Sequence, residues 1–337
     1  MRVAVVGGGA WGTALACHAA RLDHDVSMWA VEPEVADDVT RRHENTTYLP
    51  GITLPARLRA STDVTAVVGD ARLVVLVPPS EYLRPVAARV AAALHDDALV
   101  VVATKGIEET THALMTDVVR ETLPRVSPGR LAVLSGPSFA REVASGLPTD
   151  VVAASAGMEA ARAVQAALHA PMFRVYASGD MVGVQVGGAV KNVIAVAAGA
   201  CDGLSLGLNA RAALTTRGLA EMSRLGVALG ADPLTFLGLA GVGDLFLTCG
   251  GELSRNRKLG MAVAEGQDPQ AYVKGHKSVA EGFRTSAAAW ALARARGVDM
   301  PITEQVHHVL HQGRPLLEAM KLLVTRAHKE ELEGIRG

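Results

Sequence analysis

The chain has 337 residues, which is long for one domain and predicts about two domains. Its 33 basic and 34 acidic residues leave a net charge of −1, so no general attraction to nucleic acid or to an anionic membrane is expected. The three cysteines are far apart and odd in number, which favours reduced thiols in a cytoplasmic protein over a disulfide framework or a zinc site.

Short runs rich in Val, Ile and Leu alternate with Ala-rich or amphipathic stretches through the first half of the chain. The runs predict strands at 2–6, 25–29, 73–77, 99–103, 131–134 and 150–153. The stretches between them predict helices at 13–21, 82–94, 113–123 and 159–168. This alternation predicts an α/β fold with a parallel, doubly wound sheet. The first strand follows directly on the N-terminus without a signal peptide, so secretion is not expected.

After Met181 the strand-type runs stop, and the chain becomes helical with Gly and Pro between the helices. This shift in composition predicts a domain boundary near Asp180. We therefore expect a sheet domain over residues 1–180 and an all-helical domain over residues 181–337.

A glycine-rich turn connects the first strand to the first helix. Gly7, Gly9 and Gly12 fit the pattern G-x-G-x-x-G, in which glycines let the backbone approach a pyrophosphate at a helix N-terminus. Glu32 follows the second strand, about twenty residues after Gly12, where an acid binds the ribose hydroxyls of NAD. The pattern predicts a dinucleotide site. The alternatives are a tight turn without a ligand or the similar loop of a methyltransferase.

The choice between NAD and NADP depends on the charges near Glu32. NADP usually requires a cation at this strand end for its 2′-phosphate, and residues 29–33 offer none. Arg41 and Arg42 lie in the next segment and leave NADP open. Glu32 therefore favours NAD, with a solvated loop acid as the alternative interpretation.

Ligands of a doubly wound sheet bind beyond the carboxyl ends of its strands. Unusual residues follow three of the predicted strands, at 78–80, 104–106 and 135–138. Lys105 lies at one of these strand ends and is a candidate ligand-binding residue. A surface lysine on a loop is the alternative.

The stretch 181–201 is nearly long and apolar enough to span a membrane. Lys191 near its centre would cost about 2.5–3.5 kcal/mol in a bilayer, so a buried helix of a soluble domain is favoured. Lys191 projects from a face of apolar and small residues, where burial lowers the pKa of an ammonium. A lowered pKa suits proton exchange near neutral pH, and Asp244 is a candidate salt-bridge partner.

Residues 254–258 supply local positive charge. Arg255 and Asn256 are candidates for holding a phosphate, although such a run is also typical of a solvated helix face. His307 and His311 have the spacing of a metal pair, but no third ligand is evident and a solvent-exposed helix face is favoured. No metal is predicted.

Taken together, these blocks resemble the NAD(P)-dependent glycerol-3-phosphate dehydrogenase family over essentially the whole chain. The resembling blocks, in order, are VVGGGAWGTALA, HENTTYLPG, ATKGIE, LSGPSFAREVASGLPT, VKNVIAVAAGACDGLSLGLNARAALTTRGLAEM, GLAGVGDLFLTC and ELSRNRKLG. The resemblance implies a Rossmann-like dinucleotide-binding domain over 1–180, an all-α substrate-binding and catalytic domain like that of 6-phosphogluconate dehydrogenases over 181–337, and an active site between them.

The resemblance also implies an activity and a set of site residues. The activity is reversible hydride transfer between NAD(P)H and dihydroxyacetone phosphate, giving sn-glycerol 3-phosphate for phospholipid synthesis. The implied catalytic residues are Lys191 for proton transfer, with Lys105 and Asp244. The implied substrate contacts are Lys105, Gly136, Ser138, Lys191, Asp244, Ser254, Arg255 and Asn256. The implied cofactor contacts are Ala10, Trp11, Lys105, Ala140, Arg255, Val279 and Glu281, beside the glycine turn and Glu32.

The chain departs from the bacterial pattern at Ala10, where many members have Ser, and at Val31, where Arg or His is usual. The missing cation at Val31 weakens an NADP assignment. Two alternatives are a ketopantoate or 3-hydroxyacid reductase of the same architecture, which would have little use for Arg255 and Asn256, and a non-catalytic dinucleotide sensor. A homodimer is implied by the resemblance alone.

Overall fold

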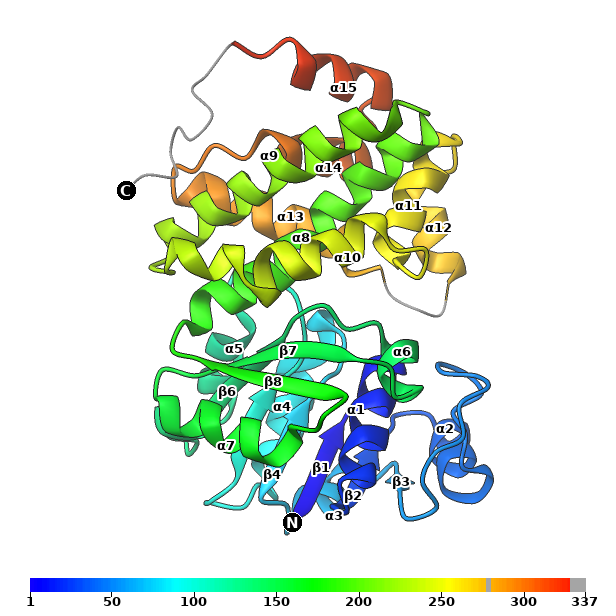
Figure 1. The fold of residues 1–337 in the computed structure, drawn as a ribbon, viewed down its shortest axis with the longest axis vertical. Helices are drawn as coiled ribbons and strands as arrows, with labels where there is room; N and C mark the ends of the chain where they lie inside the picture. The colour runs from blue at the N-terminus through cyan, green and yellow to red at the C-terminus, as the bar shows by residue number, and fades with distance from the viewer. Residues whose placement is uncertain (277–279, 328–337) are drawn as a thin grey trace. The chain divides into compact units, whose positions relative to one another are not determined.

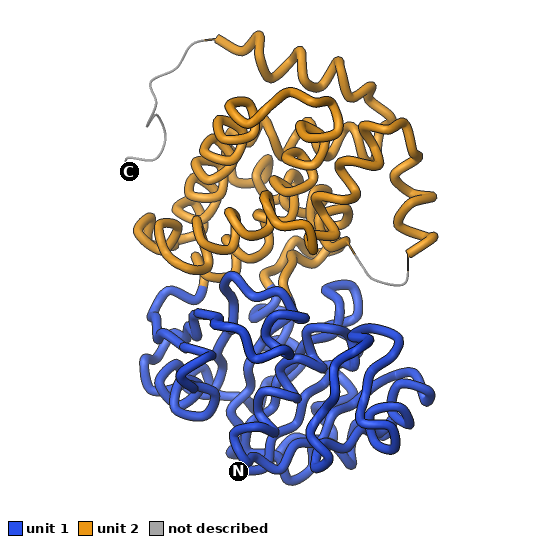
Figure 2. Tube along the Cα trace, turned by 45° about the vertical axis from the view of Figure 1, so that its right-hand side comes forward, with its two compact units in different colours: residues 1–104, 115–181 blue, residues 105–114, 182–337 orange. Residues whose placement is uncertain are grey.

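The computed structural model describes residues 1–276 and 280–327. They form two compact units, one of residues 1–104 and 115–181 and the other of the described residues in 105–114 and 182–337 (Figure 2). We call these the sheet unit and the helical unit.

The sheet unit contains one eight-stranded sheet (Figure 1). Its strand order is β3-β2-β1-β4-β5-β6-β7-β8, and all neighbours are parallel except β6 and β7. The strands are β1 (Arg2–Val6), β2 (Asp25–Trp29), β3 (Arg59–Ser61), β4 (Leu73–Leu76), β5 (Leu99–Val102), β6 (Leu131–Ser135), β7 (Thr149–Ala154) and β8 (Phe173–Ser178). This is the doubly wound order expected of a Rossmann-like domain, extended by two strands at one edge.

Helices cover both faces of the sheet. Val3 and Val5 of β1 pack in one core cluster, while Ala4 and Val6, which point to the opposite face, are equally buried. The helices of this unit are α1 (Ala10–Arg21), α2 (Pro33–Asp37), α3 (Val64–Val68), α4 (Leu83–Ala91), α5 (Met115–Thr122), α6 (Ala140–Ala144) and α7 (Met158–Leu168).

Two features of the sheet differ from the sequence prediction. The strands β3 and β8 were not predicted, because β3 is only Arg59–Ser61 and β8 alternates buried and exposed residues without an apolar run. The predicted parallel sheet is present, with one exception that the sequence did not indicate: β7 runs antiparallel to β6. A hydrophobic run indicates that a strand is buried and carries no information about its direction.

The helical unit is built around α8 (Met181–Gly203), which is drawn in green in Figure 1. By length and hydropathy α8 is long and apolar enough to span a membrane. Within the 18-residue stretch that meets this criterion, however, 89% is buried inside the protein. The remaining α-helices are α9 (Gly207–Ala228), α10 (Asp244–Gly250), α11 (Arg255–Ala264), α12 (Pro269–Gly275), α13 (Glu281–Ala295), α14 (Pro301–Gln312) and α15 (Leu316–Val324). The apolar residues of α8, which the sequence predicted to be buried in a soluble domain, therefore lie in the hydrophobic core of this unit.

Residues 105–114 belong to the helical unit although they lie between β5 and α5 in sequence. Ile107 and Leu114 pair in an isolated β-bridge, and both are buried in the hydrophobic core of the helical unit. A single boundary near Asp180 therefore does not describe the chain, which enters the helical unit once before that point.

Candidate active site

The turn between β1 and α1 is shaped by its glycines. Gly7 has φ +137°, and a Cβ built there would lie 2.8 Å from the carbonyl carbon of Val77. A Cβ at Gly12 would lie 1.9 Å from the carbonyl oxygen of Gly7, so α1 packs onto the turn only without a side chain there. A Cβ at Gly9 would meet nothing within 4 Å. The backbone at Gly9 therefore borders open space, as a cradle for a pyrophosphate requires.

A second observation fits a dinucleotide at this turn. The indole Nε1 of Trp11, in the first turn of α1, is buried and has no hydrogen-bond partner among the described residues. A buried N–H without a partner is costly, which suits a position that a ligand oxygen would satisfy. Ala10 begins α1 beside it.

Glu32 lies where the sequence predicts it, directly after β2, as the residue that precedes α2. Its carboxylate accepts a hydrogen bond of 2.8 Å from the hydroxyl of Tyr48. Asn45 connects the same loop to the glycine turn, since its amide donates to the carbonyl of Gly8 and to the Thr13 hydroxyl. The sequence analysis missed Tyr48 and Asn45, although both lie in the HENTTYLPG block.

Three further predicted residues lie in the segment after β6. Gly136 has φ +134°, and a Cβ there would lie 3.0 Å from the Cα of Val151. The Ser138 hydroxyl donates to the carbonyl of Gly136 over 2.9 Å. Ala140 begins α6, which packs against α1. This segment therefore belongs to the same unit as the glycine turn.

In the helical unit the predicted catalytic residues meet. Asp244 is fully buried, and its two carboxylate oxygens accept hydrogen bonds from two different lysines. Lys105 donates over 2.7 Å, and Lys191 forms a short ion pair with the other oxygen. Lys191 also donates to the Thr248 hydroxyl over 2.9 Å, and that hydroxyl donates to the backbone carbonyl of Asp244. We call these four residues the lysine cluster.

The local sequence explains how α8 and α10 bring the cluster together. Gly187 lies one helical turn before Lys191, and a Cβ there would lie 2.2 Å from the carbonyl oxygen of Ala240. Gly241 is similarly close to the backbone of Phe236. These two glycines let the turn that precedes α10 lie against α8, so that Asp244 at the start of α10 faces Lys191.

The lysine cluster has an unusual protonation balance. Burial has the largest effect on the pKa of Lys191 and lowers it, while the carboxylate of Asp244 raises it. The net result is a pKa of about 7. The nearby ammonium of Lys105 lowers that pKa further. Lys191 can therefore both hold and release a proton near neutral pH.

A chain of amides leads from Lys191 to the candidate phosphate-binding segment. The Asn192 side chain accepts from Asn256 over 2.8 Å, and Asn256 accepts from the backbone N–H of Gly282 over 2.8 Å. A Cβ at Gly282 would lie 2.5 Å from the Asn192 carbonyl oxygen, so α13 begins directly against α8. Asn192 is thus fixed by Asn256.

The remaining predicted residues lie around the start of α11 and α13. Ser254 caps α11 by accepting from the N–H of Arg257, and Arg255 is the exposed first residue of that helix. Glu281 is the first residue of α13. Val279 lies outside the described residues.

The predicted site residues therefore fall into two groups. The sheet unit holds the glycine turn, Glu32 and the segment from Gly136 to Ala140, and the helical unit holds the lysine cluster and the segment from Ser254 to Asn256. Thr248 was missed, yet its position one helical turn after Asp244 was a usable signal, because residues i and i+4 share a helix face.

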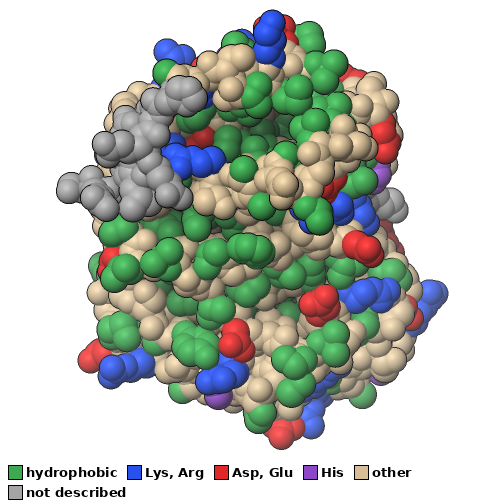
Figure 3. Space-filling model, turned by 45° about the horizontal axis from the view of Figure 1, so that its top comes forward, with side chains coloured by type: hydrophobic (Ala, Val, Ile, Leu, Met, Phe, Trp, Pro, Cys, Tyr) green, Lys and Arg blue, Asp and Glu red, His purple; other side chains and the backbone are tan. Residues whose placement is uncertain are grey.

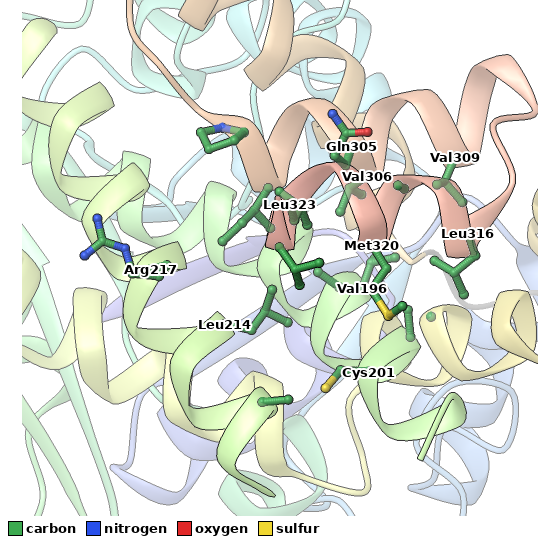
Figure 4. A pocket seen from close by; sticks show the side chains of 18 of the residues that line it. Val196, Cys201, Leu214, Arg217, Gln305, Val306, Val309, Leu316, Met320 and Leu323 are labelled. Carbon is green, nitrogen blue, oxygen red and sulfur yellow. The ribbon is translucent and has the colours of Figure 1, made fainter. Parts of the chain in front are cut away.

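An apolar cavity in the helical unit is separate from these residues. It has a volume of about 770 Å³ and is lined mainly by apolar side chains of α8, α9, α14 and α15. Figure 3 shows a hollow ringed by hydrophobic side chains, and Figure 4 shows Val196, Leu214, Val306, Met320 and Leu323 around the cavity. None of the predicted site residues lines it. An apolar cavity of this kind offers little to hold a small phosphorylated substrate.

The histidine prediction is partly wrong. His307 is buried and stacks on Trp290 at 4.4 Å between ring centroids, so it does not lie on a solvent-exposed helix face. His311 stacks on His307 and lies within hydrogen-bond distance of the Phe283 carbonyl. Packing against aromatic rings explains both positions, which the i, i+4 spacing alone did not reveal.

Known proteins resemble the chain along nearly its full length. Residues 2–161 match the N-terminal part of NAD-dependent glycerol-3-phosphate dehydrogenase, and residues 180–321 match its C-terminal part. The chain is 50% identical over 330 residues to glycerol-3-phosphate dehydrogenase (NAD(P)+) of Geobacter metallireducens, covering 98% of each. It is 49% identical over 337 residues to the protein of that name from Symbiobacterium thermophilum, covering 100% of this chain and 97% of the other.

A solved structure gives the same result. The crystal structure of glycerol-3-phosphate dehydrogenase from Coxiella burnetii superposes with a TM-score of 0.91 at 39% sequence identity, over 96% of this chain and 98% of that one. The fold prediction, a Rossmann-like domain followed by a helical domain, is thereby confirmed. The chain belongs to the NAD(P)-dependent glycerol-3-phosphate dehydrogenase family of oxidoreductases.

Proposed function

We propose that this chain catalyses reversible hydride transfer between NAD(P)H and dihydroxyacetone phosphate, with sn-glycerol 3-phosphate as the product. The observation that carries the proposal is the lysine cluster, in which a buried lysine shares a carboxylate with a second lysine. Burying such a cluster costs desolvation free energy, and ionisable groups perturbed in this way concentrate at functional sites. Family membership supplies the substrate, which the cluster alone does not specify.

Lys191 acts on the oxygen of the reacting carbon. Bound NAD(P)H supplies a hydride to the C2 carbon of the ketone, and NAD(P)+ accepts it in the reverse direction. In the reduction, the Lys191 ammonium donates one proton to the oxygen that becomes the hydroxyl, and Lys191 is left as a neutral amine. In the oxidation, the amine takes that proton back. The pKa of Lys191, lowered to about 7 by burial, allows both directions at neutral pH.

The other members of the cluster keep Lys191 in place. Asp244 fixes the direction of the Lys191 Nζ atom, and Thr248 provides a second acceptor on the same nitrogen. Lys105 is less buried than Lys191, and its amine beside Lys191 would stabilise negative charge developing on the substrate oxygen. Lys105 thus acts electrostatically, while Lys191 transfers the proton.

The segment at the start of α11 is proposed to bind the substrate phosphate. Arg255 is exposed and offers a guanidinium, and the helix N-terminus adds the partial positive charge of its N–H groups. Asn256 is already engaged by Asn192 and Gly282, so it holds the segment against α8. Binding of the phosphate would supply energy remote from the reacting carbon.

The cofactor contacts complete the proposal. Gly7, Gly9, Ala10, Trp11 and Gly12 would receive the pyrophosphate side of the dinucleotide, supported by the open space at Gly9 and the unsatisfied indole of Trp11. Further contacts are proposed for Glu32, Lys105, Ala140, Arg255, Val279 and Glu281, and substrate contacts for Gly136 and Ser138. We also propose a cytoplasmic homodimer without membrane insertion that supplies glycerol 3-phosphate to phospholipid synthesis.

The direct test is oxidation of NADH and NADPH by dihydroxyacetone phosphate, compared with ketopantoate under the same conditions. We expect turnover of the phosphorylated ketone and little of ketopantoate. Arg255→Ala should raise the KM for dihydroxyacetone phosphate at least tenfold and change kcat less, because the phosphate is bound in both ground and transition states. Arg296→Ala, an exposed arginine of the same unit, is the matched control. Pure, folded protein that turns over ketopantoate alone would refute the proposal.

A further inference from the structure

We propose that Tyr48 is a positioning residue that makes the chain prefer NAD(H) to NADP(H), by holding the Glu32 carboxylate where the adenosine ribose binds. The inference rests on the proposed dinucleotide site and goes beyond it, because it assigns the choice of cofactor to a hydrogen bond between two side chains. All the residues involved lie in the sheet unit.

The position of Glu32 suits an adenosine ribose. The residue lies at the end of β2, where a carboxylate receives ribose hydroxyls in dinucleotide-binding sheets. The Tyr48 hydroxyl donates to Oε1 of Glu32 over 2.8 Å. A carboxylate has two oxygens with about four acceptor positions, so Oε2 stays available for a ribose hydroxyl. Tyr48 thus limits how the carboxylate can turn and leaves its second oxygen unobstructed.

Burial, followed by the hydrogen bond to Glu32, raises the pKa of Tyr48 to about 12. The phenol therefore stays protonated at neutral pH and acts as a donor toward Glu32. A donor of this kind holds the oxygen that it contacts.

Tyr48 is itself held in place by Asn45. Its backbone N–H donates to the side-chain oxygen of Asn45 over 3.0 Å, and Asn45 is fully buried. The amide of Asn45 donates in turn to the carbonyl of Gly8, inside the glycine turn, over 2.9 Å. One asparagine therefore ties Tyr48 to the turn that receives the pyrophosphate. The spacing between the pyrophosphate end and the ribose end of the site is fixed by this contact.

The positions that the sequence left as candidates for a 2′-phosphate are uncharged or already paired. Val31, beside Glu32, is 62% exposed and uncharged. Arg41 is paired with Asp37 over 2.8 Å, and Arg42 with Asp38 over 3.4 Å. The arginines that the sequence left as candidates for NADP are thus paired with carboxylates of their own segment.

Together these contacts explain a preference. The ribose 2′-hydroxyl of NAD can donate to Glu32, whereas the 2′-phosphate of NADP would place negative charge against a carboxylate that Tyr48 keeps from turning away. Without the Tyr48 hydroxyl, the carboxylate of Glu32 can rotate toward solvent. The difference in affinity between NAD and NADP should then become smaller.

The experiment compares Tyr48→Phe, Glu32→Gln and the double variant with the wild type. Dissociation constants for NADH and NADPH are measured by the fluorescence of the bound dinucleotide, and kcat/KM for both is measured with dihydroxyacetone phosphate. We expect the wild type to prefer NADH, Glu32→Gln to lower that preference about hundredfold, and Tyr48→Phe about tenfold. The double variant should match Glu32→Gln, because Tyr48 acts through Glu32. Tyr176→Phe, the same change on an exposed tyrosine of β8, should alter neither ratio.

Several outcomes would overturn the inference. A wild type that prefers NADPH, an unchanged ratio in folded Tyr48→Phe, or a further loss of preference when Tyr48→Phe is added to Glu32→Gln would each do so. If Tyr48→Phe melts far below the wild type, Glu32→Ala decides, since it removes the oxygen that accepts from Tyr48. An unchanged NADH-to-NADPH ratio in folded Glu32→Ala would overturn the inference. Failure of the proposed function looks different, because the binding ratios would follow the prediction while dihydroxyacetone phosphate was not turned over.

Discussion

Among the described residues of the helical unit, Asp244 and Glu221 are the buried carboxyl groups, and their partners differ in kind. Asp244 is 0% exposed and faces two lysine amines. Glu221 of α9 is 1% exposed and accepts from the backbone N–H groups of Ile302 and Thr303, at 2.6 and 3.1 Å, and from the Thr303 hydroxyl at 3.0 Å. The first carboxylate is satisfied by groups that titrate and the second by groups that do not.

This difference separates a chemical role from a structural one. A lysine amine can give up a proton, so the partners of Asp244 can take part in a reaction. The N–H groups at the start of α14 cannot, and Glu221 instead joins α9 to the unsatisfied donors of that helix end. Burial outweighs these hydrogen bonds and raises the pKa of Glu221 to about 7. Burial alone therefore does not mark a catalytic carboxylate, because the partners decide its role.

The comparison is tested most strongly at Lys191. Replacing Lys191 by Ala should lower kcat by about 10²–10⁴-fold, because the proton donor to the substrate oxygen is lost. Asp244 keeps Lys105 as a partner, so the variant should still fold. Steady-state rates measure the loss, and the dissociation constant for NADH and the melting temperature serve as controls. A Lys191→Ala enzyme with a nearly normal kcat would remove Lys191 from the mechanism.

The pH dependence sharpens the comparison, because Lys191 and Glu221 both titrate near pH 7. Ketone reduction needs the protonated amine of Lys191, so its kcat should fall about tenfold per pH unit above pH 7. Oxidation of glycerol 3-phosphate needs the neutral amine, and its kcat should fall below pH 7. Rate profiles in both directions check this, and Glu221→Gln should leave them unchanged. A rate profile that shifts in Glu221→Gln would assign the titration to Glu221 and not to Lys191.

Thr248 should have an intermediate effect. Thr248→Val keeps the shape of the side chain and removes the hydroxyl that accepts from Lys191. We expect kcat to fall about tenfold and the apparent pKa of the rate profile to shift, since a hydrogen bond to a charged group is worth roughly 1.5–3 kcal/mol. Thr248→Ser should restore most of the rate. Equal losses in Val and Ser variants would mean that packing, and not the hydroxyl, matters there.

Replacing Glu221 should have the smallest effect on kcat of these substitutions, but it should change the pH dependence of the free energy of unfolding. In Glu221→Gln, kcat should stay within about twofold of the wild type, because Glu221 touches no proposed site residue. The wild-type carboxyl binds a proton more tightly folded than unfolded, so it should lower the free energy of unfolding by roughly 3 kcal/mol as the pH rises from about 4.5 to 7. Denaturant unfolding between pH 5 and pH 8 should show a flatter slope for Glu221→Gln. Parallel slopes for the two proteins would show that Glu221 is ionised throughout.

The sequence predicted the parts of the site that depend on composition along one element. Lys191 was conspicuous because it interrupts an apolar helix, and Asp244 because it is an acid in a run of small residues. Thr248, Tyr48 and Asn45 were not predicted, since a hydroxyl or amide has no distinctive pattern and its partners are distant in sequence. The pairing of Asn192 with Asn256 likewise joins residues 64 positions apart.

The fold was also predicted only where it depends on the composition of a single element. Burial on both faces made β1, β4 and β5 readable as apolar runs. The reversed direction of β7 and the stacking of His307 on Trp290 depend on tertiary neighbours. No periodicity within either segment could supply that information.

The ten residues from 105 to 114 set an order of events during synthesis. The sheet unit can complete its chain once β8 has left the ribosome, but Ile107 and Leu114 then still lack the helices whose core they join. Lys105 likewise lacks Asp244 until α10 has been made. The nascent protein must therefore keep this short loop exposed while the second half is translated. A chain cut after Asp180 would leave the same apolar residues uncovered, and chaperone binding at this loop is the expected consequence.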